Sequence, residues 1–375
     1  MIRAYKYKLR PNKGQAEMLS KHLGCARFIY NWGLLRNKKE YEKSKKRLSY
    51  NDLARALTAL KKQEEYSWLN EVSNMTLQQS LRHLDSAFSN FFRDLKKGKV
   101  SFPKFKSKHN HNDGATYTES KIDFDRMRVY VPKIGWVRIC KNRTFDTSFR
   151  HTSMTIRRDT CGTYWVSIVV DDNKADNPTK TKADCKRTLG IDVGLKTFIT
   201  DSEGNKVDNP RFLERSLKRL AVLQRRLSRT KNGSHRHEVA RIKVAKYHRK
   251  IRDARLDFLH KLTTRLATSY DAICIEDLDI HGLLEKGIVS KSVSSASWNT
   301  FASFLEYKCK ANGCHLVKVD RYFASSQLCS VCGHKHSDVR DLSVRTWICP
   351  ECDTKHDRDF NAAINILREG MKKVV

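Results

Sequence analysis

The chain has 375 residues, enough to bury a full core and to divide into two or three domains. Lysine and arginine number 74 against 41 aspartates and glutamates, a formal net charge of +33. Such an excess repels itself unless a polyanion neutralises it, so nucleic acid is the expected partner. No run approaches the roughly 18 apolar residues of a membrane span, and the N-terminal residues lack the apolar stretch of a signal peptide. We therefore expect no membrane association.

The first hundred residues predict one strand followed by a helical module. Residues 2–9 alternate between apolar and polar like a half-buried strand, which ends at Pro11. Apolar residues then recur every three or four positions at 19–34, 53–60 and 77–95, as on helices that bury one face. Polar and basic residues off the last stripe are candidates to meet a phosphate backbone: Gln78, Gln79, Arg82 and Arg93.

Basic and aromatic residues are interleaved immediately after this module. Phe102, Lys104, Phe105 and Lys106 form a pattern that suits phosphate contacts combined with base stacking, although a solvated loop is the alternative. The next segment reads as short strands, and we expect them to join residues 1–10 in a small β-barrel interrupted by the helices. These strands are predicted at residues 127–131, 135–140, 154–158 and 164–170. Residues 171–186 read as a linker.

A second domain is predicted to open at Arg187. A strand over 188–194 carries Asp192 among apolar neighbours, and a second strand returns over 197–201. Two long helices follow, and between residues 211 and 265 the chain has eighteen lysines and arginines against four acids. We interpret these helices as walls of a nucleic-acid channel. Their candidate contact residues are Arg225, Arg226 and Lys246.

The chain then alternates strands and helices again. Residues 272–277 predict a buried strand that ends in acids, and residues 286–297, rich in serine and glycine, predict a flexible loop. A helix over 298–309 and a strand over 315–319 follow.

Four cysteines near the C-terminal end have the spacing of a zinc site. Cys329 and Cys332 form one CxxC pair, Cys349 and Cys352 form another, and sixteen residues lie between the two pairs. Two such pairs supply four thiolates for a tetrahedral Zn²⁺, whereas the alternative is a chance arrangement among eleven cysteines. A zinc ribbon brings its ends together, so we expect residues 321–327 to lie beside a helix that begins near residue 357. The other seven cysteines are scattered, which indicates free thiols in a reducing cytoplasm.

Three predicted elements deliver acids from distant positions: Asp192, Glu276 and Asp359. Gathered in one place, three carboxylates repel one another unless cations neutralise them, and Mg²⁺ or Mn²⁺ prefers such oxygen ligands. A two-metal site of this kind can hydrolyse a phosphodiester. Taken singly, each acid would more often be a cap or a salt-bridge partner. Gly194, two residues after Asp192, would leave room for a close substrate backbone.

Together these segments resemble the TnpB/OrfB family, transposon-encoded relatives of the type V CRISPR nucleases. The matching segments are residues 189–194, 275–278, 325–333 with Cys349 and Cys352, and 357–366, and less specifically residues 4–11 and 102–106. The resemblance implies an α+β multidomain fold. Its parts are an N-terminal β-barrel or wedge domain (1–12 and 101–180), an inserted helical recognition module (13–100), an RNase H-like RuvC α/β nuclease domain (187–328 and 353–375) and an inserted zinc ribbon (329–352).

The resemblance also implies the roles of the acids and cysteines. Asp192, Glu276 and Asp359 would be catalytic and hold Mg²⁺ or Mn²⁺, and the four CxxC cysteines would hold one structural Zn²⁺. The third acid of the family precedes an x-Asn-Ala-Ala sequence, which here makes it Asp359; Asp357 is then expected to cap the helix. Asp277 is expected to face away from the site and to be structural.

The implied function is that of an RNA-guided DNA endonuclease in the cytoplasm of a prokaryote, at the nucleoid. Such a protein binds a guide RNA from the transposon end, recognises a short motif beside its target and cuts the complementary double-stranded DNA. One alternative is a nuclease-inactive, RNA-guided DNA-binding repressor, which loss of an acid would mark. Another is an RNase H-like transposase, which would yield joined DNA products.

Overall fold

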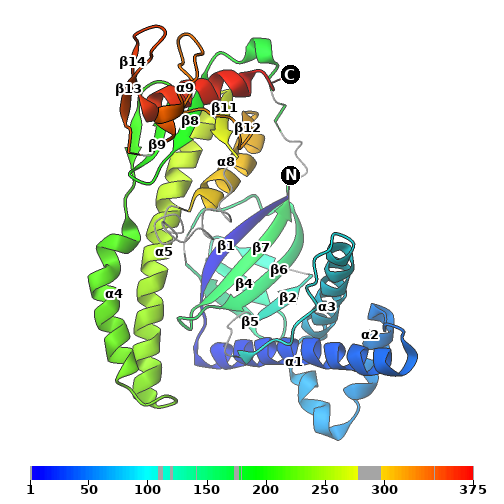
Figure 1. Cartoon of the computed structure of the whole chain (residues 1–375). Coiled ribbons are helices and arrows are strands. Elements are labelled where there is room, and N and C mark those ends of the chain that lie inside the picture. The colour runs from blue at the N-terminus through cyan, green and yellow to red at the C-terminus, as the bar shows by residue number, and fades with distance from the viewer. Residues whose placement is uncertain are drawn as a thin grey trace. The chain divides into compact units, whose positions relative to one another are not determined.

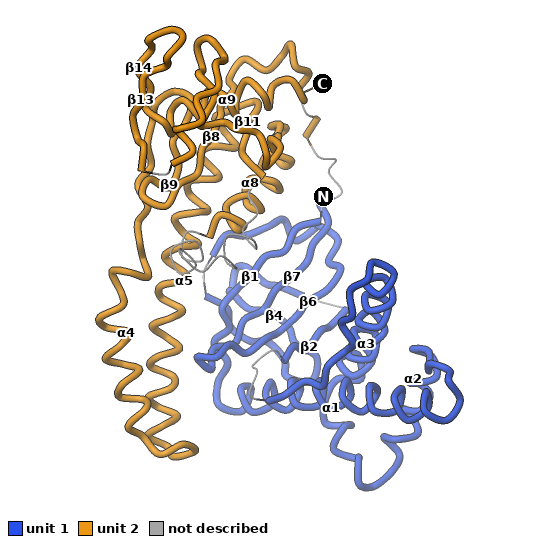
Figure 2. The backbone as a smooth tube through the Cα atoms, in the orientation of Figure 1, with its two compact units in different colours: residues 1–174 blue, residues 175–375 orange. Residues whose placement is uncertain are grey.

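A computed structural model of the chain describes residues 2–108, 113–118, 121–140, 142–172, 177–178, 180–277, 297–341 and 343–374. They belong to two compact units, residues 1–174 and residues 175–375, each with a sheet and a core of its own (Figure 2). The loop predicted over 286–297 lies outside the described residues except for Ser297. No helix among the described residues is long and apolar enough to cross a membrane.

Unit 1 contains a seven-stranded antiparallel sheet in the order β2-β6-β7-β1-β5-β4-β3 (Figure 1). Its strands are β1 (Ile2–Arg10), β2 (Gly114–Tyr117), β3 (Lys121–Asp123), β4 (Arg128–Val131), β5 (Gly135–Ile139), β6 (Arg150–Arg158) and β7 (Tyr164–Asp171). Alternate residues of these strands, such as Tyr7, Val137 and Ile168, share one core, which requires a curved sheet. In the described residues the outermost strands β2 and β3 do not pair, so hydrogen bonds do not close the predicted barrel there.

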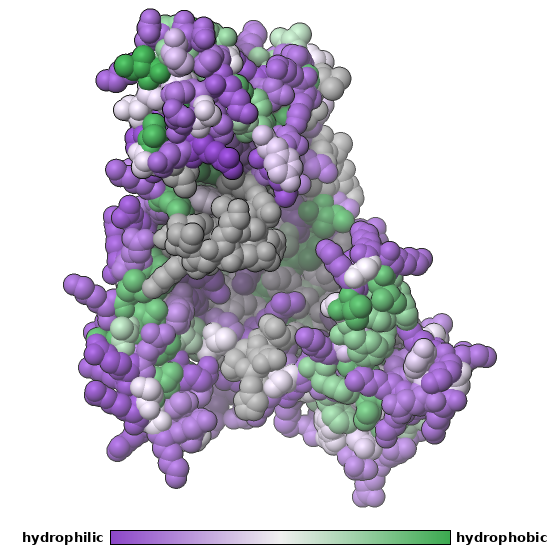
Figure 3. All heavy atoms as spheres, viewed as in Figure 1, coloured by the Kyte–Doolittle hydropathy of each residue, from purple (hydrophilic) through white to green (hydrophobic). Residues whose placement is uncertain are grey.

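The helices of unit 1 are α1 (Lys13–Ser44), α2 (Tyr50–Leu60), the 3₁₀ helix η1 (Glu64–Glu71) and α3 (Asn74–Leu95). A capping box starts α1, because the Asn12 side chain accepts from the Gln15 amide and the Gln15 side chain accepts from the Asn12 amide. The stripe of α3 is buried from Leu77 to Phe88, as predicted, but Leu95 is 45% exposed. The core therefore ends before the helix does, and an apolar area is visible over α3 in Figure 3.

Unit 2 is built on a five-stranded sheet in the order β10-β9-β8-β11-β12. The strands are β8 (Thr188–Val193), β9 (Thr197–Asp201), β10 (Lys206–Asp208), β11 (Ala272–Glu276) and β12 (His315–Val319). Strands β8, β11 and β12 run parallel, whereas β9 and β10 are antiparallel to their neighbours. The remaining short elements are η3 (Lys182–Asp184), η4 (Ser337–Arg340) and the two paired strands β13 (Thr346–Ile348) and β14 (Lys355–Asp357).

Helices cover both faces of this sheet. On one face, Leu189, Ile191 and Ile273 pack with residues of α5 (His235–Ser269) and α8 (Trp298–Asn312). On the other face, α9 (Arg358–Met371) packs against Cys274 and Val319 through Ile366. Because strand residues alternate between faces, Asp192 and Glu276 share the face that α9 covers. Helix α4 (Phe212–Ser228) forms a long hairpin with α5.

Two glycines allow α9 to lie directly on the sheet. A Cβ at Gly190 in β8 would collide with the Ala363 carbonyl and stand 2.8 Å from the Leu367 backbone nitrogen. A Cβ at Gly370 would stand 2.6 Å from the Cys274 Cβ in β11. Because neither glycine has a side chain, helix and strand backbones approach closely, and the first turn of α9 is carried toward the ends of β8 and β11.

Candidate functional site

Three acidic side chains meet where β8 and β11 end. Asp192 stands one residue before the end of β8, Glu276 is the last residue of β11, and Asp359 is in the first turn of α9. Strands β8 and β11 are adjacent and parallel, with Ile191 opposite Ile275. The carboxyl ends of the two strands therefore lie together. Asp192 and Glu276, which directly follow these isoleucines, reach the same edge of the sheet.

The three acids interact electrostatically. Burial raises the pKa of Asp192 well above its usual range, and the neighbouring charges of Glu276 and Asp359 raise it further, while Arg358 opposes them. Burial also raises the pKa of Glu276, against the effect of a hydrogen bond from Ser325. Buried carboxylates that repel one another are stabilised when a cation binds between them.

The neighbours of these acids have separate roles. Asp357 is the N-cap of α9, as expected: its side chain accepts from the Phe360 amide at 3.0 Å, and it pairs with Lys206 at 2.7 Å. Asp277 lies 3.4 Å from the Arg321 guanidinium, an ion pair outside the acid group. Gly194 has a local reason, because a Cβ there would stand 2.7 Å from the Thr197 carbonyl across the β8–β9 turn.

The four cysteines of the CxxC pairs come together. Their sulfur atoms all lie within 4.8 Å of one another, which is the donor set of a tetrahedral zinc site. Each pair closes in a tight turn whose next residue has positive φ, Gly333 at +80° and Asp353 at +52°. The four-cysteine cluster expected from the spacing is therefore present, and its chemistry fits Zn²⁺.

Residues outside the sequence prediction surround this cluster and the acids. The His356 Nε2 lies 3.1 Å from the Cys329 sulfur, and the His356 ring packs on Trp347 with centroids 4.7 Å apart. From the same region, the Arg345 guanidinium comes within 3.7 Å of Asp359. No spacing rule in the sequence points to either contact, because both depend on how the ribbon folds back onto α9.

One face of α9 binds the segment that leads into the first CxxC pair. The Asn365 amide donates to the carbonyls of Ser325, at 2.8 Å, and of Leu328, at 2.7 Å. The expectation that residues 321–327 lie beside the last helix is therefore confirmed. Asn361 and Arg368 bind the same segment further along, and the three polar residues are spaced at i, i+4 and i+7, one helical face. This spacing of three polar residues is the signal in the sequence that points to a polar contact on this face of the helix. None of the three residues was assigned this role from the sequence alone.

The candidate nucleic-acid contacts of unit 1 differ in how available they are. Lys104 is exposed, and so is Arg82, whose guanidinium lies 4.5 Å from the Tyr50 ring centroid. Lys106 is half-buried: its ammonium lies 4.1 Å from the Tyr30 ring centroid, and burial lowers its pKa. Its backbone is also held on both sides by the Asn31 side chain, at 2.8 and 2.9 Å. Lys106 thus anchors its own loop, whereas Lys104 points to solvent.

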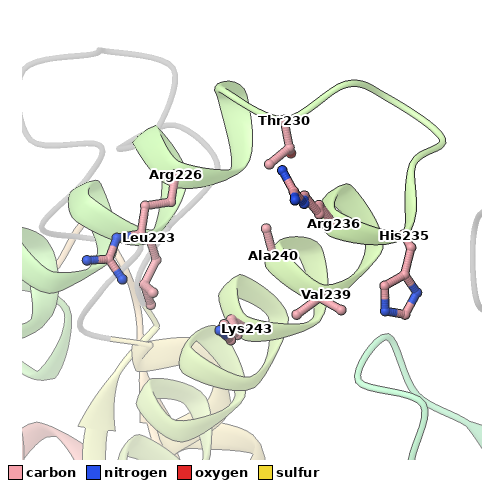
Figure 4. Close-up of a pocket in the computed structure, with 8 residues that line it drawn as sticks. All are labelled: Leu223, Arg226, Thr230, His235, Arg236, Val239, Ala240 and Lys243. Atoms are coloured by element: carbon pink, nitrogen blue, oxygen red, sulfur yellow. The ribbon is translucent and has the colours of Figure 1, made fainter.

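The candidates of unit 2 lie on the α4–α5 hairpin. Arg225, Arg226 and Lys246 are all accessible to solvent, at least in part. Near the turn of the hairpin is a cavity of about 250 Å³ lined by both apolar and basic side chains (Figure 4). Its lining residues are Leu223, Arg226, Thr230, His235, Arg236, Val239, Ala240 and Lys243. No acid lines it, and in the part of the chain that the structure describes its two arginines and its lysine form no salt bridge.

Comparison with known proteins places this geometry in a class. The chain matches a family model described as "Probable transposase" of the OrfB/IS605 group over residues 167–286 and the Cas12f1-like TNB domain over residues 298–366. A third model, described as a helix-turn-helix domain, matches residues 1–46, where the structure has the strand β1 and the single helix α1. The fold is similar to that of the solved Cas12f1–sgRNA–target DNA complex, with a TM-score of 0.59 and 15% identity over 95% of this chain and 83% of that one.

Two relatives are similar in sequence over almost the whole chain. A protein of Streptomyces pristinaespiralis, named as a candidate RNA-guided DNA endonuclease, is 40% identical, and the alignment covers 98% of this chain and 89% of the relative. InsQ of Escherichia coli K12, named in the same way, is 29% identical over 98% of this chain and 92% of its own length. The chain therefore belongs to the TnpB/OrfB family.

Proposed function

We propose that this protein is a transposon-encoded, RNA-guided DNA endonuclease. The observation that carries the proposal is that two adjacent parallel strands and the first turn of α9 bring Asp192, Glu276 and Asp359 to one edge of the sheet. A guide RNA from the transposon end would select the target by base pairing, and the protein would recognise a short adjacent motif. The relatives' names and the likeness to a Cas12f1 complex support this proposal.

We assign four parts to the chain. Residues 1–12 and 101–180 form the wedge domain around the curved sheet, and residues 13–100 form the recognition module. Residues 187–328 and 353–375 form the RuvC nuclease domain, into which residues 329–352 insert as the zinc ribbon. The strand order β10-β9-β8-β11-β12, with β9 antiparallel to β8, is that of RNase H-like folds and supports the nuclease assignment.

The donor atoms of the acid site fit Mg²⁺ or Mn²⁺. Asp192, Glu276 and Asp359 offer only carboxylate oxygens, the ligands that hard divalent cations prefer. When bound, such cations activate water and stabilise the leaving oxygen in phosphodiester hydrolysis. The chain's own residues orient the carboxylates: α9 carries Asp359, and the Ser325 hydroxyl donates to Glu276. Cys329, Cys332, Cys349 and Cys352 would hold one structural Zn²⁺, which sets the position of α9.

The α4–α5 hairpin and the segment after α3 that carries Lys104 are the proposed nucleic-acid surfaces. Arg225, Arg226 and Lys246 present positive charge along the hairpin, and the cavity near its turn is lined by both cations and apolar side chains. A phosphate at the cations with a base or sugar against the apolar side chains would satisfy both kinds of lining residue. The proposed partners are the guide RNA and the double-stranded target DNA. We propose no membrane partner.

The decisive experiment supplies the RNA separately. In Mg²⁺ at physiological salt, the purified protein should cut no double-stranded DNA alone, and adding RNA with the transposon-end scaffold and a matching guide should start cutting at one site. A new guide should move the cut to its own complementary sequence. Cutting with the same site preference whatever guide is supplied would leave a plain metal-dependent nuclease. Joined DNA products would indicate transposase chemistry, and guided binding without cutting would indicate a repressor.

A further inference from the structure

A single serine connects the zinc ribbon region to the acid site. Ser325 is 5% exposed, and its hydroxyl donates to Oε1 of Glu276, forty-nine residues earlier in the chain. A hydrogen bond to a half-buried carboxylate is charge-assisted and correspondingly strong. The bond engages one carboxylate oxygen and holds the plane of the group, which leaves Oε2 in a defined direction.

Helix α9 in turn fixes the segment that carries this serine. Asn365, 6% exposed, donates to the Ser325 carbonyl at 2.8 Å and to the Leu328 carbonyl at 2.7 Å. Asn361, 1% exposed, donates to the Leu328 carbonyl at 2.7 Å and accepts from the Ser330 amide at 2.8 Å. Buried amides that bond on several sides permit little displacement of the segment they hold.

The helix that carries Asp359 therefore also sets the hydroxyl that orients Glu276. We propose that Ser325, held by Asn365, is a positioning residue that aligns the Glu276 carboxylate for divalent-cation binding. This inference rests on the proposed function, because it assumes that Glu276 is a metal ligand. Its physical basis is that a carboxylate already held in its ligating orientation loses less freedom on binding a cation than one that is free to rotate.

The test measures Mn²⁺ binding directly, without nucleic acid or cleavage. Full-length, zinc-loaded protein is titrated with Mn²⁺, and free Mn²⁺ is measured by electron paramagnetic resonance. Glu276→Ala is the reference for loss of a ligand. Ser325→Ala should weaken Mn²⁺ binding by about tenfold, the lower end of the usual effect of removing a partner that orients a ligand. Ser325→Thr, which keeps the hydroxyl, should restore most of the affinity.

Two further variants separate positioning from a general disturbance. Ser326→Ala is the matched control, because among the described residues the Ser326 side chain makes no hydrogen bond. It should bind Mn²⁺ like the unmodified protein. Asn365→Ala should weaken Mn²⁺ binding in the same direction as Ser325→Ala, because it releases the Ser325 carbonyl. Zinc content is measured on every variant and should be unchanged in Ser325→Ala.

The outcomes distinguish two failures. Unchanged Mn²⁺ affinity in Ser325→Ala, together with weakened binding in Glu276→Ala, would overturn the role of Ser325 and leave the metal site standing. Loss of zinc in Ser325→Ala, or equal weakening in Ser326→Ala, would also overturn it, because the effect would then be structural. Unchanged binding in Glu276→Ala would show that the acid site itself, and with it the proposed function, is wrong.

Discussion

The cysteine cluster and the acid site are two constellations of the same unit, assembled in opposite ways. All four cysteines lie within residues 329–352. Each CxxC pair closes in its own tight turn, and the residue after each pair has a positive φ. The acids come from residues 192, 276 and 359 and meet only because two parallel strands end together and a helix crosses them. The first site is encoded locally, whereas the second depends on every contact that places β8, β11 and α9. Substitutions in each site, and in the packing between them, test this contrast.

The largest expected effect is on the acid site. Asp192→Ala, Glu276→Ala or Asp359→Ala should each abolish cleavage, while guide-dependent DNA binding survives, because each removes a proposed metal ligand and leaves the basic surfaces intact. Cleavage and binding are measured on the same guide-matched DNA. Asp357→Ala is the control: it should keep substantial activity and lose about 1 kcal/mol of stability with the helix cap. A dead Asp357→Ala beside an active Asp359→Ala would reverse the assignment of the third acid.

The second-largest expected effect is that of the four-cysteine cluster on the acid site. Elemental analysis should find one Zn²⁺ per chain, and Cys332→Ser should lose both the zinc and the nuclease activity, because the ribbon region is bonded to the helix that carries Asp359. Full activity in a verified zinc-free preparation would show that the ribbon does not position α9. The two constellations would then be independent.

A glycine substitution tests the packing on which the acid site depends. Gly190→Ala should destabilise the protein by about 1–3 kcal/mol or more, because the added methyl group collides with the backbone of α9 at Ala363. The free energy of unfolding is measured by denaturant titration. Gly24→Ala in α1 is the matched control, since nothing lies within 4 Å of its added carbon. The change at Gly24 should be neutral or slightly stabilising, because alanine favours a helix. Equal effects at the two glycines would argue against the close approach of α9.

The smallest expected effect concerns the hairpin, outside both constellations. Arg226→Ala and Lys243→Ala should each weaken RNA binding and reduce the slope of log affinity against log salt by about one, if each contacts one phosphate. The slope is measured by titrating labelled RNA over a range of salt concentrations. Lys261→Ala is the control, because this exposed lysine of α5 is paired with Asp257 at 2.7 Å. An equal slope change in Lys261→Ala would show that RNA binding depends on total charge and not on the cations that line the cavity.

Much of this architecture could be predicted from the sequence, because local geometry reports it. The spacing of apolar residues indicates the strands and helices, and the CxxC spacing indicates the four-cysteine cluster. The sequence before Asp359 also predicts that Asp357 caps the last helix. Each of these inferences uses residues fewer than about 25 positions apart, where helix and strand geometry and turn preferences fix the distances. Strands β2 and β3 are not predicted from the sequence, because neither has the repeated alternation of apolar and polar residues that marks the similarly short β4.

What only the tertiary structure decided is how distant residues meet. The exposed end of α3, the half-burial of Lys106 on Tyr30 and the local role of Gly194 all depend on neighbours that the sequence pattern does not identify. The hydrogen bond from Ser325 to Glu276 spans forty-nine positions, and its geometry depends on sheet register, on helix packing and on the asparagines of α9 together. The sequence by itself indicated which side chains are candidates for the chemistry. Only the packing of α9 on the sheet decided which groups hold them in place, because such contacts have no period in the chain.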